Sequence, residues 1–486
     1  MKAPRGAHEA QPGSLSAHQP PRAAQLRPRV SDTPLQNCGI LSRPRHRGPL
    51  RLPAFPTSVV FDNGRATARL SLPHSVLLDC LHLDSQKPDS AILASLRAAD
   101  WEQLEALATQ GSVRFQFYQR LQQPRLQSTV PTALLERLQV AAHEQTLRVL
   151  GLEATLVEIL KACAAKDLPV MTLKGMHLAH AVYEGPFERD MADVDLLFRP
   201  ADMARATNMF KSLGYRILHN ADNLVSLAPA NNEYTLVHPR LGTFVDVHWS
   251  LTRPQKEAAI DEPALWSRAR TLTISGAPTL TLSREDLLAY TCFHASNHHY
   301  FAAVGLRPFV DIARICARGP EPDWGTLANR VRKWGWERGT WLTLSMAREY
   351  FGAPVPETTL TGMMDGPLDR DQLHKTALTL LFLGSNPEDR IENNIVRLWS
   401  SSSHWARLRL FIRRLFPPRG QLVQEFGLNA YPALASLPFL YLRRIAGLLT
   451  RHGPKLWALQ RADSKYRSVL ASQRRLIAWL DAPDHR

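Results

Sequence analysis

Apolar side chains recur at helical spacing along the first folded part of the chain, from about Ser75 onward. The clearest example runs from Thr132 to about Ala165, where the apolar face is formed by Leu135, Leu138, Ala142, Val149, Leu156 and Leu160. Apolar residues at intervals of three and four positions line one side of an α-helix. The pattern therefore predicts a helical lead-in over residues 75–166, which ends in one long helix or two.

The pattern changes to short apolar runs between residues 167 and 275. Residues 169–173 predict one strand, and residues 193–197 predict a second strand with acids at alternate positions. Residues 237–244 place a turn that contains Pro and Gly between apolar and β-branched residues, which is typical of a β-hairpin. This part of the chain is therefore expected to form a small mixed sheet.

The chain becomes helical again after this core. Residues 280–352 predict a helical domain that lines the cleft, and residues 370–486 predict a basic helical region. Residues 431–449 are apolar, but two prolines and two arginines interrupt them, so the run falls short of the ~20 residues that span a bilayer. A buried helix is the favoured interpretation, and a helix on a membrane surface is the alternative. The expected fold class is α+β, with the small sheet embedded between all-helical N- and C-terminal regions.

Three aspartates on the predicted strands are candidates for a metal site. Successive side chains of a strand point to opposite faces, so Asp193 and Asp195 project the same way, about 6.5 to 7 Å apart at Cα. Asp246 and His248 share a face for the same reason, although His248 with Trp249 is more typical of a packed strand end. If the hairpin lies beside the Asp193 strand, three carboxylates surround two hard cations about 3.5 to 4 Å apart. These aspartates are therefore predicted metal ligands and catalytic residues.

The turn at Lys174 and Gly175 predicts a phosphate site. It follows an apolar run and precedes a segment with the composition of a helix that starts at the glycine. A helix N-terminus offers free N–H groups and a positive dipole to an anion, and Lys174 adds a cation. Arg189 could supply a further phosphate contact. Its alternative role is that of a solvated loop residue paired with Glu188 or Asp190.

These motifs, taken in order, resemble those of the uncharacterised nucleotidyltransferase family within the DNA polymerase β-like superfamily. The matching segments are Leu173-Lys174-Gly175, Tyr183, Arg189, Asp193-Val194-Asp195-Leu196-Leu197 and Val245-Asp246-Val247-His248-Trp249. The resemblance extends from about Ser75 to about Tyr350, more than half of the chain. It implies a nucleotidyltransferase core in which Asp193 and Asp195 bind Mg²⁺ (or Mn²⁺) and Asp246 is the third carboxylate.

A histidine cluster follows the core, at His294, His298 and His299. The i, i+4 spacing of the first two permits shared metal coordination on a helix, but no acidic ligand is adjacent. A polar lining of the nucleotide cleft is the favoured interpretation. Arg307 and Asp311 on the following helix are expected to face the same cavity.

Charge and cysteine content limit the classes of partner and the cellular location that the sequence supports. The formal net charge is +15, but residues 1–60 carry +7 and residues 401–486 carry +11, so the part between them is slightly acidic. A slightly acidic centre is unlike a polymerase channel, and the basic ends are interpreted as solvated surfaces, with anionic partners as the alternative. The five cysteines are odd in number and widely spaced, which indicates neither a disulfide framework nor a zinc ribbon. A reducing cytoplasm is the expected location.

Residues 1–70 are expected to be a disordered, basic, proline-rich tail. Ten of the 35 prolines lie in residues 1–60, where apolar periodicity is absent. Such a composition cannot bury enough apolar surface to offset the entropy of ordering.

The sequence therefore predicts a metal-dependent enzyme that moves a nucleoside monophosphate from a nucleoside triphosphate to a hydroxyl-bearing acceptor and releases pyrophosphate. The acceptor is a small molecule, a saccharide or a protein. One alternative is a non-catalytic nucleotidyltransferase-like subunit of a biosynthetic assembly. Another is a glycosyltransferase with an Asp-x-Asp motif, but its alternating strands and helices are missing from the helical lead-in. A haloacid-dehalogenase phosphatase is disfavoured because Leu197 carries no hydroxyl.

Overall fold

The computed structural model describes most of the chain between Val59 and residue 482. The described residues are 59–62, 65–68, 70–217, 232–252, 260–302, 304–364, 369–383, single residues and short pieces between 412 and 422, 436–460 and 464–482. By its internal contacts, Leu50–Arg486 forms one unit, to which all the described residues belong. The α+β fold class expected from the sequence is confirmed.

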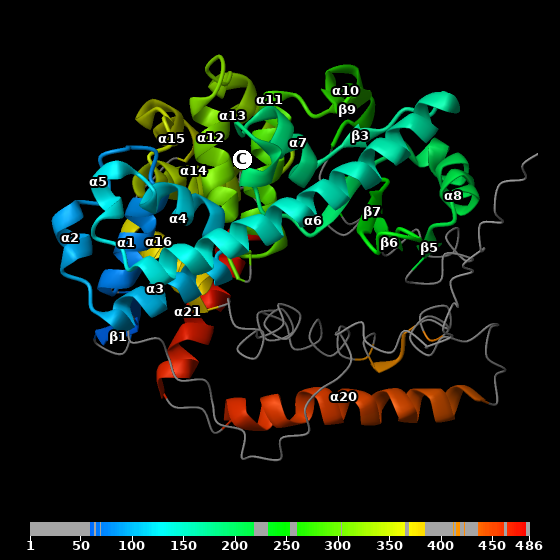
Figure 1. Ribbon diagram of the computed structural model, residues 1–486. Helices are drawn as coiled ribbons and strands as arrows, with labels where there is room; N and C mark the ends of the chain where they lie inside the picture. The colour runs from blue at the N-terminus through cyan, green and yellow to red at the C-terminus, as the bar shows by residue number, and fades with distance from the viewer. Residues whose placement is uncertain are drawn as a thin grey trace, which may run out of the picture. The chain divides into compact units, whose positions relative to one another are not determined.

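The lead-in is helical, as the periodicity predicts. Its helices are α1 (Leu72–Leu81), α2 (Ser90–Ala94), α3 (Ala98–Gln110), α4 (Arg114–Leu121), α5 (Pro124–Gln127) and α6 (Thr132–Ala165). The last is a single helix of 34 residues that runs from α4 to the strands (Figure 1). Leu134 and Leu138 near its start belong to one hydrophobic cluster, whereas Leu152, Leu156 and Ile159 belong to another. One helix therefore contributes to both cores.

The core contains a seven-stranded mixed sheet with the order β5-β6-β7-β4-β3-β9-β8. The strands are β3 (Met171–Thr172), β4 (Asp193–Leu197), β5 (Arg216–Ile217), β6 (Glu233–Val237), β7 (Phe244–His248), β8 (Arg270–Ile274) and β9 (Ala277–Thr281). The predicted hairpin is present as β6 and β7, and β7 pairs with β4 in parallel. The sheet extends to Thr281, because β9 pairs with β3, so the predicted core boundary at residue 275 falls inside the β8–β9 hairpin.

The two faces of β4 and β7 have different neighbours. Val194, Leu196, Val245 and Val247 are fully buried in a cluster with side chains of α6 and of α8 (Met203–Ser212). The opposite face of β4 carries the aspartates, and Leu197 at its end packs into the other cluster. The short helix α7 (Lys174–Ala181) follows β3 directly and contacts β4. The alternation of the strand pattern thus leaves one face of the sheet free for polar groups.

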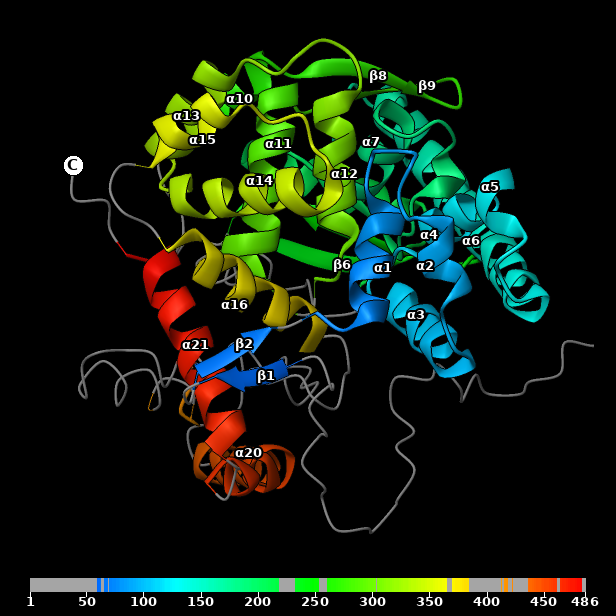
Figure 2. The same cartoon turned by 90° about the vertical axis from the view of Figure 1, so that its left-hand side faces the viewer.

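A group of helices packs together after the sheet in the chain. They are α11 (Arg284–Phe293), the π-helical turn η5 (His294–His298), α12 (Arg307–Ala317), α13 (Trp324–Lys333), α14 (Glu337–Phe351) and α15 (Glu357–Met363). Ser283 caps α11, since its Oγ accepts a hydrogen bond from the Asp286 N–H. Figure 2 shows α11, α12 and α14 side by side, and the three contact one another.

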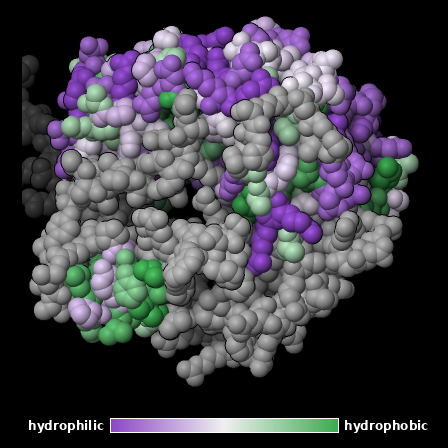
Figure 3. Space-filling model, turned by 180° about the vertical axis from the view of Figure 1, so that it is seen from behind, coloured by the Kyte–Doolittle hydropathy of each residue, from purple (hydrophilic) through white to green (hydrophobic). Residues whose placement is uncertain are grey.

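The C-terminal region is helical where it is described. It contains α16 (Arg370–Leu383), α20 (Leu437–Gln460) and α21 (Ser464–Leu480). Within α20, Leu440 and Arg444 are buried, but Phe439 and Leu442 are each 66% exposed, so the expectation of a buried helix holds for one side of it only. No helix among the described residues is long and apolar enough to cross a membrane. Among the residues coloured in the view from behind, hydrophilic ones prevail in the upper part, and a separate hydrophobic group lies at the lower left (Figure 3).

The expected disordered tail is too long at its C-terminal end. Strands β1 (Val59–Asp62) and β2 (Arg65–Ala68) form an antiparallel hairpin, and β2 contacts α16 and α21. The contact of β2 with α16 and α21 joins the start of the described chain to its end. Local periodicity in the sequence cannot indicate such a long-range contact. Residues 1–58 lie outside the described part of the chain, and their disorder stays a prediction.

Deleting residues 1–58 is expected to leave the melting temperature unchanged, because the proline-rich composition predicts no packed structure there. A deletion through Ala68 is expected to lower it, because it removes the hairpin that contacts α16 and α21. Differential scanning calorimetry of the two truncated chains beside the full chain tests both statements. Loss of the folded protein on the shorter deletion would show that the tail takes part in the fold.

Candidate active site

Asp193, Asp195 and Asp246 lie on one face of neighbouring parallel strands. In the register of β4 and β7, Asp195 is the Cα partner of Asp246, and Asp193 stands two residues earlier on β4. All three line a cavity of about 290 Å³, which we call the carboxylate cleft, between the sheet and helices α11 and α12. The predicted position of the hairpin beside the Asp193 strand is therefore confirmed.

Asp195 is the centre of a buried charge network. Its Oδ1 accepts a hydrogen bond from Lys174 Nζ at 2.8 Å and lies 3.0 Å from His248 Nε2. The other ring nitrogen of His248, Nδ1, lies 2.9 Å from Glu233 Oε2. His248 is 1% exposed and Asp195 4%. The register places Glu233 on β6 directly opposite His248, so the chain of contacts crosses three adjacent strands.

The pKa values in this network move in directions that favour its charged form. Burial opposes the ionisation of Asp195, but Lys174 and His248 outweigh burial and hold its pKa well below the usual range. Burial likewise opposes the charge on His248, yet its bonds to Asp195 and Glu233 raise its pKa to about 9. Burial also opposes the ionisation of Glu233, but its contact with His248 lowers its pKa to about 2. At neutral pH the network therefore holds two anions and two cations.

The other two aspartates are in the opposite situation. Burial, reinforced by the charges of Asp195 and Asp246, raises the pKa of Asp193 to about 6. Among the described residues Asp193 has no hydrogen-bond or ion-pair partner. Burial also raises the pKa of Asp246, although its Oδ1 accepts a hydrogen bond from Thr235 Oγ1 at 2.6 Å. These two carboxylates are therefore the under-compensated anions of the cleft.

The turn at Lys174 and Gly175 lines the same cleft. Helix α7 begins at Lys174, one residue before the predicted glycine start, and Lys174 has a positive φ of 37°. Its ammonium is paired with Asp195 and lies 5.9 Å from the centre of the Tyr290 ring. A Cβ at Gly175 would lie 3.4 Å from Arg189 Nη1 and from Met191 Sδ, which is ordinary van der Waals contact, so these side chains alone do not require a glycine here.

Arg189 also lines the cleft, but it is not a solvated loop residue. Its side chain is buried, and its Nε and Nη2 donate to the two carboxylate oxygens of Asp311 at 2.9 Å each. Tyr183 Oη donates to Asp311 Oδ1 at 2.7 Å. The proposed partners Glu188 and Asp190 are instead paired with Arg314 and Arg148. The alternative interpretation of Arg189 as a solvated loop residue is therefore wrong. Arg189 instead lines the cleft while it is paired with Asp311.

The helical wall of the cleft carries the histidine cluster. His294, His298 and His299 lie within 4.5 to 5.2 Å of one another between ring centres, and all three line the cleft. Arg307 and Asp311 of α12 line it as well, as the sequence predicts. Burial and the neighbouring cations hold the pKa of His294 well below the usual range, so this ring is neutral.

A model of the uncharacterised nucleotidyltransferase family matches residues 97–352 of the chain. This match covers more than half of the sequence and includes every residue of the carboxylate cleft. The chain belongs to this family. No curated protein matches it.

Two solved structures of the antibiotic-resistance factor ANT(2'')-Ia are similar to the chain at 14% identity. The solution structure covers 41% of this chain and 96% of its own, with a TM-score of 0.27. The crystal structure, a complex with adenylyl-2''-tobramycin, covers 43% of this chain and 95% of its own, with a TM-score of 0.23. These values add no argument to the family assignment.

For this member of the family, the sequence did not indicate two polar residues that contact the charge network, Glu233 and Tyr290. Glu233 lies on the first strand of the hairpin, and only the register of β6 with β7 brings it to His248. Tyr290 lies on α11, where its ring faces Lys174. An acid directly across a hairpin from a strand histidine is a signal that could have indicated Glu233.

The residues of the cleft fit a divalent cation in chemistry. Carboxylate oxygens are the ligands that hard cations prefer, and three of them lie on one face of the sheet. The Lys174 ammonium, held by Asp195, shows that a positive charge is stable in this position. In the described part of the chain, however, no three His, Cys, Asp or Glu side chains are close enough together to hold an ion as they stand. Lys174 and His248 both contact Oδ1 of Asp195, so a cation at that oxygen would compete with the ammonium.

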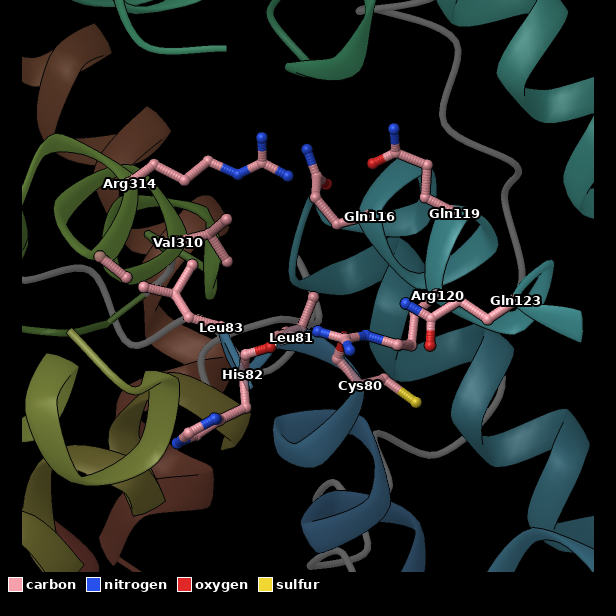
Figure 4. A pocket seen from close by; sticks show the side chains of 11 residues that line it. Cys80, Leu81, His82, Leu83, Gln116, Gln119, Arg120, Gln123, Val310 and Arg314 are labelled. Atoms are coloured by element: carbon pink, nitrogen blue, oxygen red, sulfur yellow. Dashed lines mark hydrogen bonds between the residues drawn. The ribbon is translucent and has the colours of Figure 1, made fainter. Parts of the chain in front are cut away.

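A second cavity, of about 360 Å³, lies against a different side of α12 (Figure 4). In that view Arg314 of α12 and Gln116 of α4 point toward one another. Both contact Glu188, since Gln116 Nε2 donates to its backbone oxygen and Arg314 Nη1 to its carboxylate at 3.1 Å. The cavity contains no predicted site residue. Of the two arginines that line it, Arg314 is ion-paired with Glu188, which makes Arg314 a useful control for the arginines of the cleft.

Proposed function

We propose that the chain transfers a nucleoside monophosphate from a nucleoside triphosphate to a hydroxyl group of an acceptor. In this reaction the acceptor oxygen forms a bond to the α-phosphorus, and the bond from that phosphorus to the pyrophosphate oxygen breaks. The acceptor loses its hydroxyl proton, and pyrophosphate leaves. Such a reaction requires mainly positioning and charge stabilisation from the protein.

The observation that supports this proposal best is the pairing of Asp195 with Asp246 across adjacent strands inside a cleft of the matched family region. Asp193, Asp195 and Asp246 would hold Mg²⁺ or Mn²⁺, and a bound ion supplies charge neutralisation at the reacting phosphate and activation of the hydroxyl. Lys174 and His248 hold the pKa of Asp195 low, so this carboxylate is ionised at neutral pH and available to a cation.

Asp246 is the residue proposed to receive the acceptor proton. Its pKa is raised by burial, which makes it a better base than an ordinary aspartate. One of its oxygens is held by Thr235, which leaves the other for the acceptor hydroxyl. His248 is proposed to fix the direction of the Asp195 carboxylate, because its Nε2 contacts Asp195 Oδ1 while Glu233 holds the other ring nitrogen.

Lys174, Gly175 and Arg189 are proposed to contact the nucleotide. The ammonium of Lys174 would pass from Asp195 to a phosphate oxygen when a cation takes its place at the carboxylate. The guanidinium of Arg189 would act while still held by Asp311, which fixes its plane. Gly175 would let the phosphate approach the backbone.

A panel of nucleoside triphosphates, each with Mg²⁺ or Mn²⁺, tests the proposal by thermal shift. A ligand that binds only the folded state raises the melting temperature, so at least one nucleotide should stabilise the protein in a metal-dependent way. If no nucleotide does so, the alternative of a non-catalytic subunit becomes the better interpretation.

Lys174→Ala is expected to weaken binding of the best nucleoside triphosphate about tenfold or more, as expected for one charge-assisted contact. The loss should shrink at high salt, because screening weakens the attraction that the substitution removes. Isothermal titration calorimetry at low and high ionic strength measures both effects. An unaltered affinity would limit Lys174 to its pairing with Asp195.

A further inference from the structure

The cations of the carboxylate cleft differ in whether an anion already compensates them. Lys174 is paired with Asp195 and Arg189 with Asp311, each at hydrogen-bond distance. Arg307 is different. In the described part of the chain no carboxylate lies within ion-pair distance of it. Its charge is therefore the least compensated among the lysine and arginine side chains that line the cleft.

The hydrogen bonds of Arg307 lead to the same conclusion. Its Nη1 donates to the backbone oxygen of Asp190 at 2.6 Å. Its Nε is buried and has no hydrogen-bond partner among the described residues. A carbonyl oxygen accepts a hydrogen bond but does not neutralise a charge. A buried guanidinium in this state is costly unless an anion completes its shell.

The position of Arg307 also suits a phosphate. It is the first residue of α12, a helix of 11 residues, so the positive end of the helix dipole adds to its charge. Arg307 donates to the backbone oxygen of Asp190, three residues before Asp193, whereas Asp246 is held by Thr235 of β6, on the other side of β7 from β4. The arginine thus lies toward the Asp193 side of the carboxylates, and the proposed base lies toward the other.

From these contacts we infer that Arg307 binds the β- and γ-phosphates of the nucleotide, so that pyrophosphate leaves toward α12 and the acceptor enters beside Asp246. The inference rests on the proposed function, and it assigns the leaving group to one end of the cleft and the acceptor to the other. A guanidinium can bind phosphate oxygens with two parallel N–H bonds, which a lysine cannot reproduce. Arg307 is then a binding residue for the leaving group.

The test compares Arg307→Gln with the unchanged chain in titration calorimetry, with the best triphosphate of the panel and the corresponding diphosphate and monophosphate, all with Mg²⁺. The glutamine amide can still donate to the Asp190 oxygen. The triphosphate should bind about ten- to a hundredfold more weakly, as expected for hydrogen bonds to a charged group. The monophosphate should bind equally well to both chains.

Two further variants complete the design. Arg307→Lys keeps the charge and should give an intermediate loss, and it replaces Arg307→Gln if that protein fails to fold. Arg314→Gln changes an arginine of the same helix that is already paired with Glu188 and lines the other cavity, so it should leave all three affinities unchanged.

The outcomes separate the two proposals. If the unchanged chain binds no nucleotide, the proposed function fails, and the inference about Arg307 fails with it. If the unchanged chain binds the triphosphate and both Arg307 variants bind it equally well, only the inference is overturned. An equal loss for triphosphate and monophosphate would also overturn it, because the contact would then not be with the β- and γ-phosphates.

Discussion

Asp195→Asn is expected to abolish nucleotidyl transfer and to remove metal-dependent nucleotide binding. The substitution takes away the carboxylate that both Lys174 and His248 contact, so a divalent cation loses one proposed ligand while both cations of the network stay. Asp193→Asn is expected to have the same two effects, without the loss of the network. Turnover and nucleotide affinity, measured separately, show whether both fall.

Asp246→Asn separates catalysis from binding. If Asp246 accepts the acceptor proton, turnover should fall by about 10² or more, yet the variant should retain much of its nucleotide affinity. The amide can still accept the hydrogen bond from Thr235, so the variant is a close structural match of the parent. Full turnover in all three variants would rule out the proposed metal triad.

His248→Leu is expected to lower the free energy of unfolding by about 3 to 5 kcal/mol, because it leaves Glu233 without its partner and Asp195 with Lys174 alone. The effect should depend on pH. The folded-state pKa of His248 is raised to about 9, so the stability gained from its charge is fully present below about pH 6.5. That stability is lost as the pH rises through about 9.

Urea unfolding of both chains across this pH range measures the effect. The difference between them should be largest below about pH 6.5 and should shrink as the pH rises through about 9. Glu233→Gln is the matched control, because it removes one of the two anions that raise the pKa of His248. The alkaline loss of stability should then begin at lower pH. A pH-independent difference would mean that His248 acts by packing rather than by charge.

The strands of the site could be predicted from the sequence because their signals are local. Alternation of acids and valines fixes which side chains share a face, and the Pro and Gly of the hairpin fix where the chain reverses. The partners of those acids could not be predicted in the same way. Arg189 and Asp311 are separated by 122 positions, and their pairing depends on how α12 packs against the sheet. Asp195 and His248 are separated by 53 positions, and their contact depends on the register of β4 with β7.

The same limit explains the errors. The sequence offers Glu188 and Asp190 as partners of Arg189 because they are its neighbours, but these acids pair with Arg314 and Arg148. The sequence does not predict that the hairpin of β8 and β9 extends the sheet, because the local patterns of RTLTI and APTLT do not indicate a pairing partner. In the fold, β9 joins the sheet by pairing with β3. In each case the local pattern gives the type of element and the tertiary packing decides its neighbour.

Helix α6 has a consequence for how variants of this chain should be understood. Its residues belong to both hydrophobic clusters, so the two clusters share a rigid element and cannot loosen independently. A cavity made near Leu138 would therefore destabilise α6 as a whole, including the part around Leu156 that packs against the strands of the site. Activity lost through a substitution far from the cleft would then reflect a smaller folded population rather than an altered reaction.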